Sequence, residues 1–144
     1  MAGGAAMKAL SRYLLALFLV VAGTLHFIVP DFYSKIMPPY LPWPLGLVYL
    51  SGAIELLLGL LLLSPRCARW AAWGIIALLI AVFPANLYLY QHQEIMPGPP
   101  LLHLSRLPLQ AVFILWAFWH TKGGGRRSGE SPYQSGPLSA APPR

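Results

Sequence analysis

The chain has 144 residues, of which 57% are hydrophobic and only 10% charged, and its formal net charge at neutral pH is +6. So few charged residues leave too little polar surface to solubilise a globular domain of this size, which excludes a soluble protein. The cations are divided among short loops and a tail, without the dense basic face of a nucleic-acid groove, so we expect no nucleic-acid partner.

The first predicted element is an apolar helix over residues 10–29. Its length is close to the ~20 residues that a helix needs to cross a bilayer. The small residues at 22–24 resemble a signal-peptide cleavage site, but the apolar run continues to Val29 and exceeds the ~7–15 residues of a signal core. We therefore expect an uncleaved first span.

Three further apolar runs follow at residues 45–63, 70–90 and 101–119. They are apolar on every face, as helices surrounded by lipid are. The connections 30–44 and 91–100 are crowded with prolines, which cannot continue a helix. Residues 1–120 are therefore predicted to form an all-α integral membrane domain, a four-helix bundle running up, down, up, down.

The distribution of cations predicts the orientation of this bundle. Lysines and arginines precede or open the first run, occupy the short loop 64–69 and recur after residue 119, whereas the opposite loops contain Lys35 alone. Cytoplasmic loops carry the excess of Lys and Arg, so both termini are expected in the cytoplasm of a multi-pass plasma (inner) membrane protein. Residues 121–144, rich in Gly, Ser and Pro, are expected to form a disordered cytoplasmic tail.

Polar side chains interrupt the four apolar runs and mark a candidate ligand-binding site, which we assign to His26, Glu55, Asn86, Arg106 and Gln110. Charged groups in hydrocarbon are costly and usually face the bundle interior. At 1.5 Å per residue, Arg106 lies about 7.5 Å below the outer end of its span, Gln110 about 13.5 Å and Glu55 about 15 Å. His26 and Asn86 lie within one turn or so of the outer ends of their spans, so all five belong to the outer half.

Small residues beside these side chains support an inward orientation. Glu55 lies between Gly52 and Gly59, and His26 follows Gly23 by one turn, so both project from faces on which helices can approach closely. Pro84 leaves the carbonyl of Ile80 without its helical donor, and Asn86, Gln110 and Arg106 are nearby donors for such freed carbonyls.

We expect Glu55 to pair with Arg106, because a carboxylate in the bilayer needs a counter-charge, and His26 to reach water near the outer surface. A structural alternative stays open: a Glu–Arg pair fixes helix register, and Asn86 and Gln110 serve as interhelical hydrogen bonds. Tyrosines and tryptophans near the span ends, Tyr33 and Trp116 among them, are expected to be interface anchors.

The single cysteine, Cys67, lies in the short loop between the second and third runs. One thiol forms no intrachain disulfide, and the sequence has no Cys and His pairs at the spacing of a structural zinc site. We therefore predict no metal site, no catalytic residue and no cofactor of the chain's own.

Four segments together resemble the DoxX family of small four-span bacterial membrane proteins: HFIVPDFYSKIMPPYLPWP (26–44), LVYLSGAIELLLGLLLL (47–63), AVFPANLYLY (81–90) and RLPLQAVFILWAFW (106–119). The resemblance covers about residues 10–120 and implies the fold and the membrane location more than an activity. That family takes its name from a membrane subunit of a thiosulfate:quinone oxidoreductase. The resemblance implies a role as site residues only for His26, Glu55, Asn86 and Arg106.

Three functions follow as hypotheses, none of which makes the chain an enzyme on its own. The first is an accessory subunit of a membrane redox or stress-response system that binds a small molecule or a quinone in the polar pocket. The second is a scaffold or assembly factor that packs against a membrane or redox protein partner. The third is a small proton-coupled transporter, for which 144 residues without inverted repeats are few, so that a homo-oligomer in the bilayer would favour it.

Overall fold

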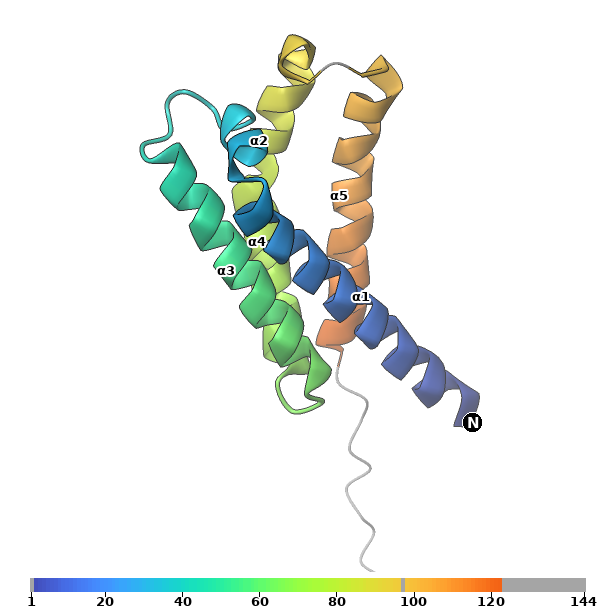
Figure 1. Cartoon of the computed structure of the whole chain (residues 1–144). Helices are drawn as coiled ribbons and strands as arrows, with labels where there is room; N and C mark the ends of the chain where they lie inside the picture. Colours follow the sequence, from blue (N-terminus) through green and yellow to red (C-terminus); the bar gives the residue numbers. More distant parts are fainter. Residues whose placement is uncertain (1, 97, 123–144) are drawn as a thin grey trace, which may run out of the picture.

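The protein is built from helices. The computed structural model of the chain describes residues 2–96 and 98–122, and within these ranges there is no strand (Figure 1). In chain order the elements are α1 (Ala2–Ile28), α2 (Pro30–Lys35), α3 (Pro44–Leu63), α4 (Ala68–Gln91), the 3₁₀ helix η1 (Gln93–Ile95) and α5 (Pro100–Thr121). The predicted all-α class is confirmed.

The four predicted runs correspond to α1, α3, α4 and α5, and most of their ends differ from the prediction by no more than two residues. The exception is the start of α1 at Ala2, because the residues before the apolar run, such as Ala6 and Lys8, are good helix formers. The predicted loop 30–44 contains the short helix α2, which begins with a proline at its first turn, where the missing N–H costs nothing. Of the predicted tail, 121–144, Thr121 belongs to α5, and the part from residue 123 onward lies outside the described residues.

The four long helices alternate in direction (Figure 1). Helix α3 packs against α1 on one side and α4 on the other, α4 packs against α5, and α1 contacts α5 only slightly. Polar contacts join the beginning of α1 to the end of α5: the Nζ of Lys8 donates to the carbonyl of Lys122, and the indole of Trp116 donates to Ser11 at 2.7 Å. The bundle is therefore closed at this end.

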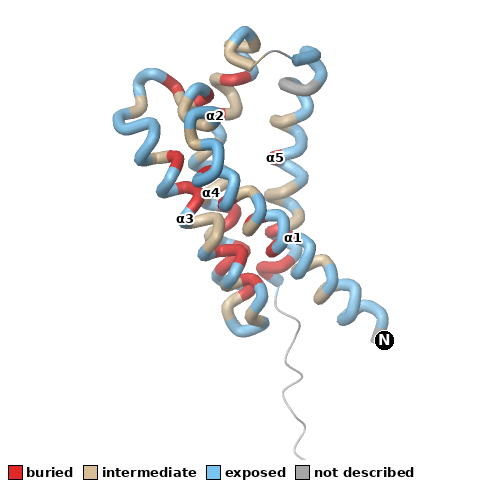
Figure 2. Tube along the Cα trace, in the orientation of Figure 1, coloured by how far each residue is buried: buried red, intermediate tan, exposed pale blue. Residues whose placement is uncertain are grey.

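The apolar core lies in the same half of the bundle. Its fully buried side chains include Leu15 of α1, Leu62 of α3 and Ile75 of α4, with Ala117 of α5 beside them. Figure 2 shows buried positions gathered where the helices face one another, while their outer faces are exposed. The opposite half, toward α2 and the end of α4, has fewer fully buried apolar side chains.

Three helices are long and apolar enough to cross a membrane: Gly3–Ile28, Pro44–Leu63 and Ala68–Gln91. Large apolar side chains such as Leu17, Leu60 and Trp70 point outward, with 61%, 58% and 78% of their surface exposed. An outer surface of this kind is suited to lipid and indicates a membrane protein. Helix α5 is not among the three found within the described residues.

Helices α1 and α3 approach each other through glycines. A Cβ atom on Gly23 would lie 2.8 Å from the carbonyl oxygen of Gly52, and one on Gly59 would lie 3.1 Å from the carbonyl oxygen of Ala16. Contacts this short involve backbone, which cannot rotate away. The small-residue stripe predicted on this face of α3 therefore sets how closely the two helices pack.

Replacing Gly52 by alanine should weaken this packing. The added Cβ would lie 2.6 Å from the Cβ of His26 and 3.0 Å from the carbonyl oxygen of Gly23, so α1 would have to move. Overpacking of this kind costs about 1–3 kcal/mol. We expect Gly52→Ala to unfold at a lower temperature than the wild type in detergent, as measured by differential scanning fluorimetry.

Gly46→Ala is the matched control on the same helix. Its Cβ would meet Trp43 at 3.6 Å, an ordinary contact, so its unfolding temperature should stay near that of the wild type. Equal losses in the two variants would show that the approach of α1 and α3 at Gly52 is not tight.

Candidate functional site

A cavity of about 450 Å³ lies between α1, α2, α3 and α4, in the half of the bundle opposite the apolar core. Most of its lining is apolar, with side chains from α1, α3 and α4, such as Phe18, Ile54 and Val82. A few polar side chains converge on it: His26, Tyr33, Ser51, Glu55 and Asn86. Three of the five predicted site residues, His26, Glu55 and Asn86, therefore line one cavity.

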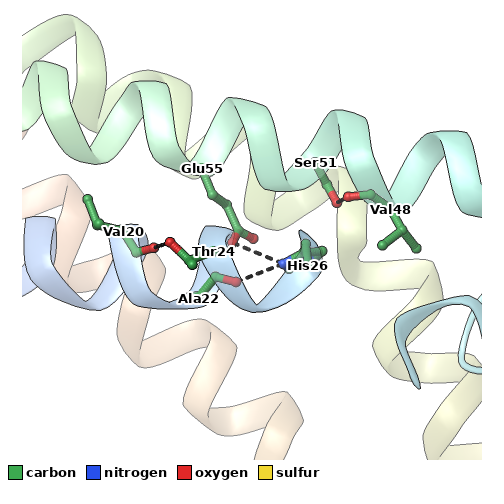
Figure 3. Close-up of polar contacts among 7 residues, drawn as sticks. All are labelled: Val20, Ala22, Thr24, His26, Val48, Ser51 and Glu55. Carbon is green, nitrogen blue, oxygen red and sulfur yellow. Dashed lines mark hydrogen bonds and ion pairs between the residues drawn. The ribbon is translucent and has the colours of Figure 1, made fainter. Parts of the chain in front are cut away.

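His26 and Glu55 face each other across the contact between α1 and α3 (Figure 3). The Nδ1 atom of His26 lies 2.9 Å from the carbonyl oxygen of Ala22 and 3.5 Å from the Oε2 atom of Glu55. A carbonyl oxygen only accepts, so Nδ1 carries the proton and donates it to Ala22. The distance to Glu55 is an ion-pair distance and too long for a good hydrogen bond.

The Oε2 atom of Glu55 is buried and has no hydrogen-bond partner among the described residues. The side chain as a whole keeps only 14% of its surface exposed. Leaving a buried acceptor unsatisfied costs about 1–3 kcal/mol, and more when the group is charged. Glu55 is therefore the polar group of the cavity whose bonding is least complete.

Tyr33 of α2 lies over His26. The two rings are stacked, with centroids 3.9 Å apart and planes inclined by 18°. Burial raises the pKa of the Tyr33 hydroxyl, the charge of Glu55 raises it further, and that of Arg106 lowers it. The phenol therefore stays protonated at neutral pH and is a hydrogen-bond donor at the cavity.

Asn86 and Gln110 form a second polar contact, between α4 and α5. The Nδ2 of Asn86 donates to the Oε1 of Gln110 at 2.9 Å, and the Nε2 of Gln110 donates to the carbonyl of Leu79. Leu79 precedes Ile80, whose carbonyl Pro84 leaves without a helical donor. Gln110 thus lies at the proline-disturbed turn of α4, and it does not line the cavity.

Arg106 does not form the expected pair with Glu55 in the described part of the chain. Its Nη2 atom lies 3.3 Å from the sulfur of Met96, in the segment between η1 and α5. Helix α5 packs mainly against α4 and contacts α1 only slightly, and the ionisable group recorded 3.5 Å from Glu55 among the described residues is the ring of His26. Arg106 is likewise absent from the cavity lining.

Two features of the polar arrangement were missed by the sequence prediction. Tyr33 and Trp116 were expected at the membrane interface, yet Tyr33 stacks in the cavity and Trp116 bonds to Ser11. Ser11 also lies 3.2 Å from the Nε2 of His120, which completes a polar cluster at the closed end of the bundle. Ser11 and His120 lie at matching depths near the inner ends of their helices, so depth in the inner half would have indicated this cluster, as it did for the polar residues of the outer half.

Within the described residues, no group of three or more His, Cys, Asp or Glu side chains is placed to hold a metal ion. The cavity instead combines an apolar wall with one acidic and a few neutral polar groups. This chemistry suits an organic molecule with a polar end.

A family model for a domain of unknown function, DUF8561, matches residues 15–121, which is well over half of the chain. The chain belongs to this family. The DUF8561 match covers α3, α4 and α5 whole and most of α1, and so includes every predicted site residue. No curated protein and no solved structure matches the chain.

The predicted resemblance to the DoxX family is wrong, because the family that matches is DUF8561. The motifs that carried it are single polar residues and prolines within Leu- and Ala-rich runs. Such residues recur wherever a small helical bundle places polar groups and kinks in a membrane, so they do not separate one family from another. The redox association that came with that resemblance has no support from the DUF8561 match.

Asn86 and Gln110 should show a measurable coupling. Replacing either by leucine breaks their shared hydrogen bond, so the double variant should lose less stability than the sum of the two single variants. Interhelical bonds in membranes average about 0.6 kcal/mol and reach about 1.7. The measurement is the free energy of unfolding in bicelles for the complete double-mutant cycle.

Ser51 and Gln110 provide the control cycle, since the hydroxyl of Ser51 donates to the carbonyl of Val48 on its own helix, whereas Gln110 bonds to Asn86 and to the carbonyl of Leu79. Its coupling energy should be near zero. A coupling energy between Asn86 and Gln110 no larger than that of the control pair would contradict the hydrogen bond between them.

Proposed function

We propose that this DUF8561 protein binds a small, largely apolar molecule with a polar head group in the cavity between α1, α2, α3 and α4. The observation that carries the proposal is the cavity itself: about 450 Å³, mostly apolar, with a few polar side chains converging on one region. Ligand sites typically have volumes of about 300–1,000 Å³, with mostly apolar walls and a few polar groups that fix the orientation of the ligand.

The state of Glu55 supports the same proposal. A protein that used this residue only to fix helix register would complete its hydrogen bonds, as Asn86 and Gln110 do. Instead a buried carboxylate oxygen stays unpartnered beside an apolar cavity. A ligand that satisfies this oxygen would offset the cost of keeping it there.

A quinone, the molecule expected from the sequence, is one member of the proposed ligand class. Its binding would make the protein an accessory subunit for a membrane process, without a reacting group supplied by the chain. The DUF8561 family adds nothing for or against this choice.

We also propose that α5 is a fourth span and that both termini lie in the cytoplasm, at the plasma membrane. Helix α5 has 22 residues and would extend about 33 Å, the thickness of the hydrocarbon core. The cations Lys8, Arg66, Arg69 and Lys122 lie near the closed end of the bundle, and cytoplasmic ends carry such cations.

Filling the cavity should release the ligand. Ala81 lines the cavity, so Ala81→Phe places an aromatic ring inside it. We expect mass spectrometry of organic extracts from protein in native membrane discs to detect one small molecule per wild-type chain and to lose it in Ala81→Phe.

Ala77→Phe is the matched control, because residue 77 lies one turn away on α4, is also exposed and does not line the cavity. It should retain the molecule. Equal amounts of the same small molecule in extracts of the wild type and both variants would contradict a ligand site in this cavity.

A scaffold remains the second candidate, favoured by the exposure of Tyr40 (71%) and Trp43 (84%) in the segment before α3. Aromatic side chains of this kind anchor protein interfaces. A protein partner that co-purifies in equal amount and is lost in Trp43→Ser, together with extracts unchanged by Ala81→Phe, would support it over ligand binding.

The proposed topology is tested by labelling with a membrane-impermeant maleimide. Cys67 lies between α3 and α4 and should react only after the cells are permeabilised. In a Cys67→Ser background, Glu94→Cys in η1 should react in intact cells, because it lies at the opposite end. The reverse labelling pattern would contradict the orientation, and labelling of both sites in intact cells would contradict the number of spans.

A further inference from the structure

The hydrogen bonds around the cavity leave it rich in acceptors. The proton on Nδ1 of His26 is donated to Ala22, and the hydroxyl of Ser51 donates to the carbonyl of Val48 at 2.9 Å (Figure 3). The amide nitrogen of Asn86 donates to Gln110, outside the cavity lining. Three of the polar side chains that line the cavity therefore already donate a hydrogen bond to another group of the protein.

The atoms that remain are mainly acceptors. In its neutral form His26 keeps a lone pair on Nε2, Ser51 keeps the lone pairs of its hydroxyl, and Asn86 keeps an amide oxygen that bonds to none of the described residues. Glu55 adds the buried Oε2 atom. The remaining donors are the Tyr33 hydroxyl and the second amide hydrogen of Asn86.

Charge decides which head group fits this set. No lysine or arginine is among the described residues that line the cavity, and Arg106 is directed to Met96. Glu55 is the acid of the cavity, and the ion-pair distance to it recorded among the described residues is that to the ring of His26, at 3.5 Å. A buried carboxylate is stable only when it is paired and hydrogen-bonded.

We propose that the ligand is a cationic amphiphile whose protonated amine donates hydrogen bonds to Glu55. This inference rests on the proposed function, because it requires the cavity to be a binding site. The ammonium supplies both the missing donor and the missing positive charge, and the apolar chain lies along Phe18, Ile54 and Leu78. A quinone or a fatty acid presents acceptors and would leave the Oε2 atom unpaired.

The ring of Tyr33 adds a second favourable contact for such a head group. It lies over His26 at the same side of the cavity as Glu55, with its hydroxyl close enough for the charge of Glu55 to affect its pKa. Aromatic faces attract cations, and desolvated sites strengthen this attraction.

Four probes with the same twelve-carbon chain test the head group: dodecylamine, dodecyltrimethylammonium, dodecanol and dodecanoic acid. Each is titrated into the full-length protein in a non-ionic detergent, and native mass spectrometry reports the fraction of chains with one bound molecule. We expect dodecylamine to bind about tenfold more tightly than dodecanol, because a hydrogen bond to a charged group contributes about 1.5–3 kcal/mol. Dodecyltrimethylammonium has the charge but no N–H donor and should fall between them.

Glu55→Gln should remove the preference for the amine while leaving the affinity for dodecanol unchanged. Glu94→Gln is the matched control, because it makes the same change of charge at an exposed residue of η1 outside the cavity. It should bind all four probes as the wild type does. The order of the probes on the wild-type protein tests the head group even where Glu55→Gln does not fold.

The outcomes separate this inference from the proposed function. Dodecanol or dodecanoic acid bound as tightly as the amine, and lost in Ala81→Phe, would overturn the cationic head group while the cavity remained a ligand site. A preference for the amine that survives Glu55→Gln would also overturn it. If no probe binds the wild-type protein more tightly than it binds Ala81→Phe, both proposals fail.

Discussion

The structure depends on the close approach of α1 and α3 at Gly23 and Gly52. No side chain separates the two backbones at this point, since a Cβ on either glycine would meet the carbonyl oxygen of the other at 3.0 Å or less. Helices in lipid associate through such packing rather than through the hydrophobic effect. His26 and Glu55 each follow one of these glycines by three residues on the same helical face. The contact that holds the two helices together therefore also brings an imidazole and a carboxylate to 3.5 Å.

The bundle divides into a closed half and an open half. Helix α1 contacts α3 along much of its length but reaches α5 only slightly, where Ser11 meets Trp116 and His120. The apolar core fills this closed half. Toward the other end the described residues show no such polar contact between α1 and α5, and a cavity of about 450 Å³ lies between α1, α2, α3 and α4. The polar side chains of the cavity lie where apolar packing is least complete, and there they have room to meet a ligand or water.

Length and composition predicted the helices well, because a run of about twenty apolar residues has few other structures open to it in a bilayer. Depth and small neighbours were also enough to select His26, Glu55 and Asn86 as residues of one cavity. The partners could not be predicted in this way, because depth is one coordinate and pairing also needs the order of helices around the bundle. Arg106 has a suitable depth, yet α5 packs mainly against α4 and contacts α1 only slightly, so Glu55 meets His26 instead. A tyrosine in a predicted loop was assigned to the interface, because the sequence does not show that α2 folds back over the cavity.

The completeness of hydrogen bonding separates the buried polar residues into two groups. Gln110 accepts from Asn86 and donates to the backbone of α4, so its amide is used on both sides and its role is complete within the protein. Glu55 lies in a comparable environment, but one of its oxygens has no partner among the described residues. Selection for stability alone would favour glutamine or an apolar side chain at residue 55, because an unpaired buried carboxylate is costly. A charge kept at such a cost is more simply explained by a molecule that enters the cavity than by the packing of the helices.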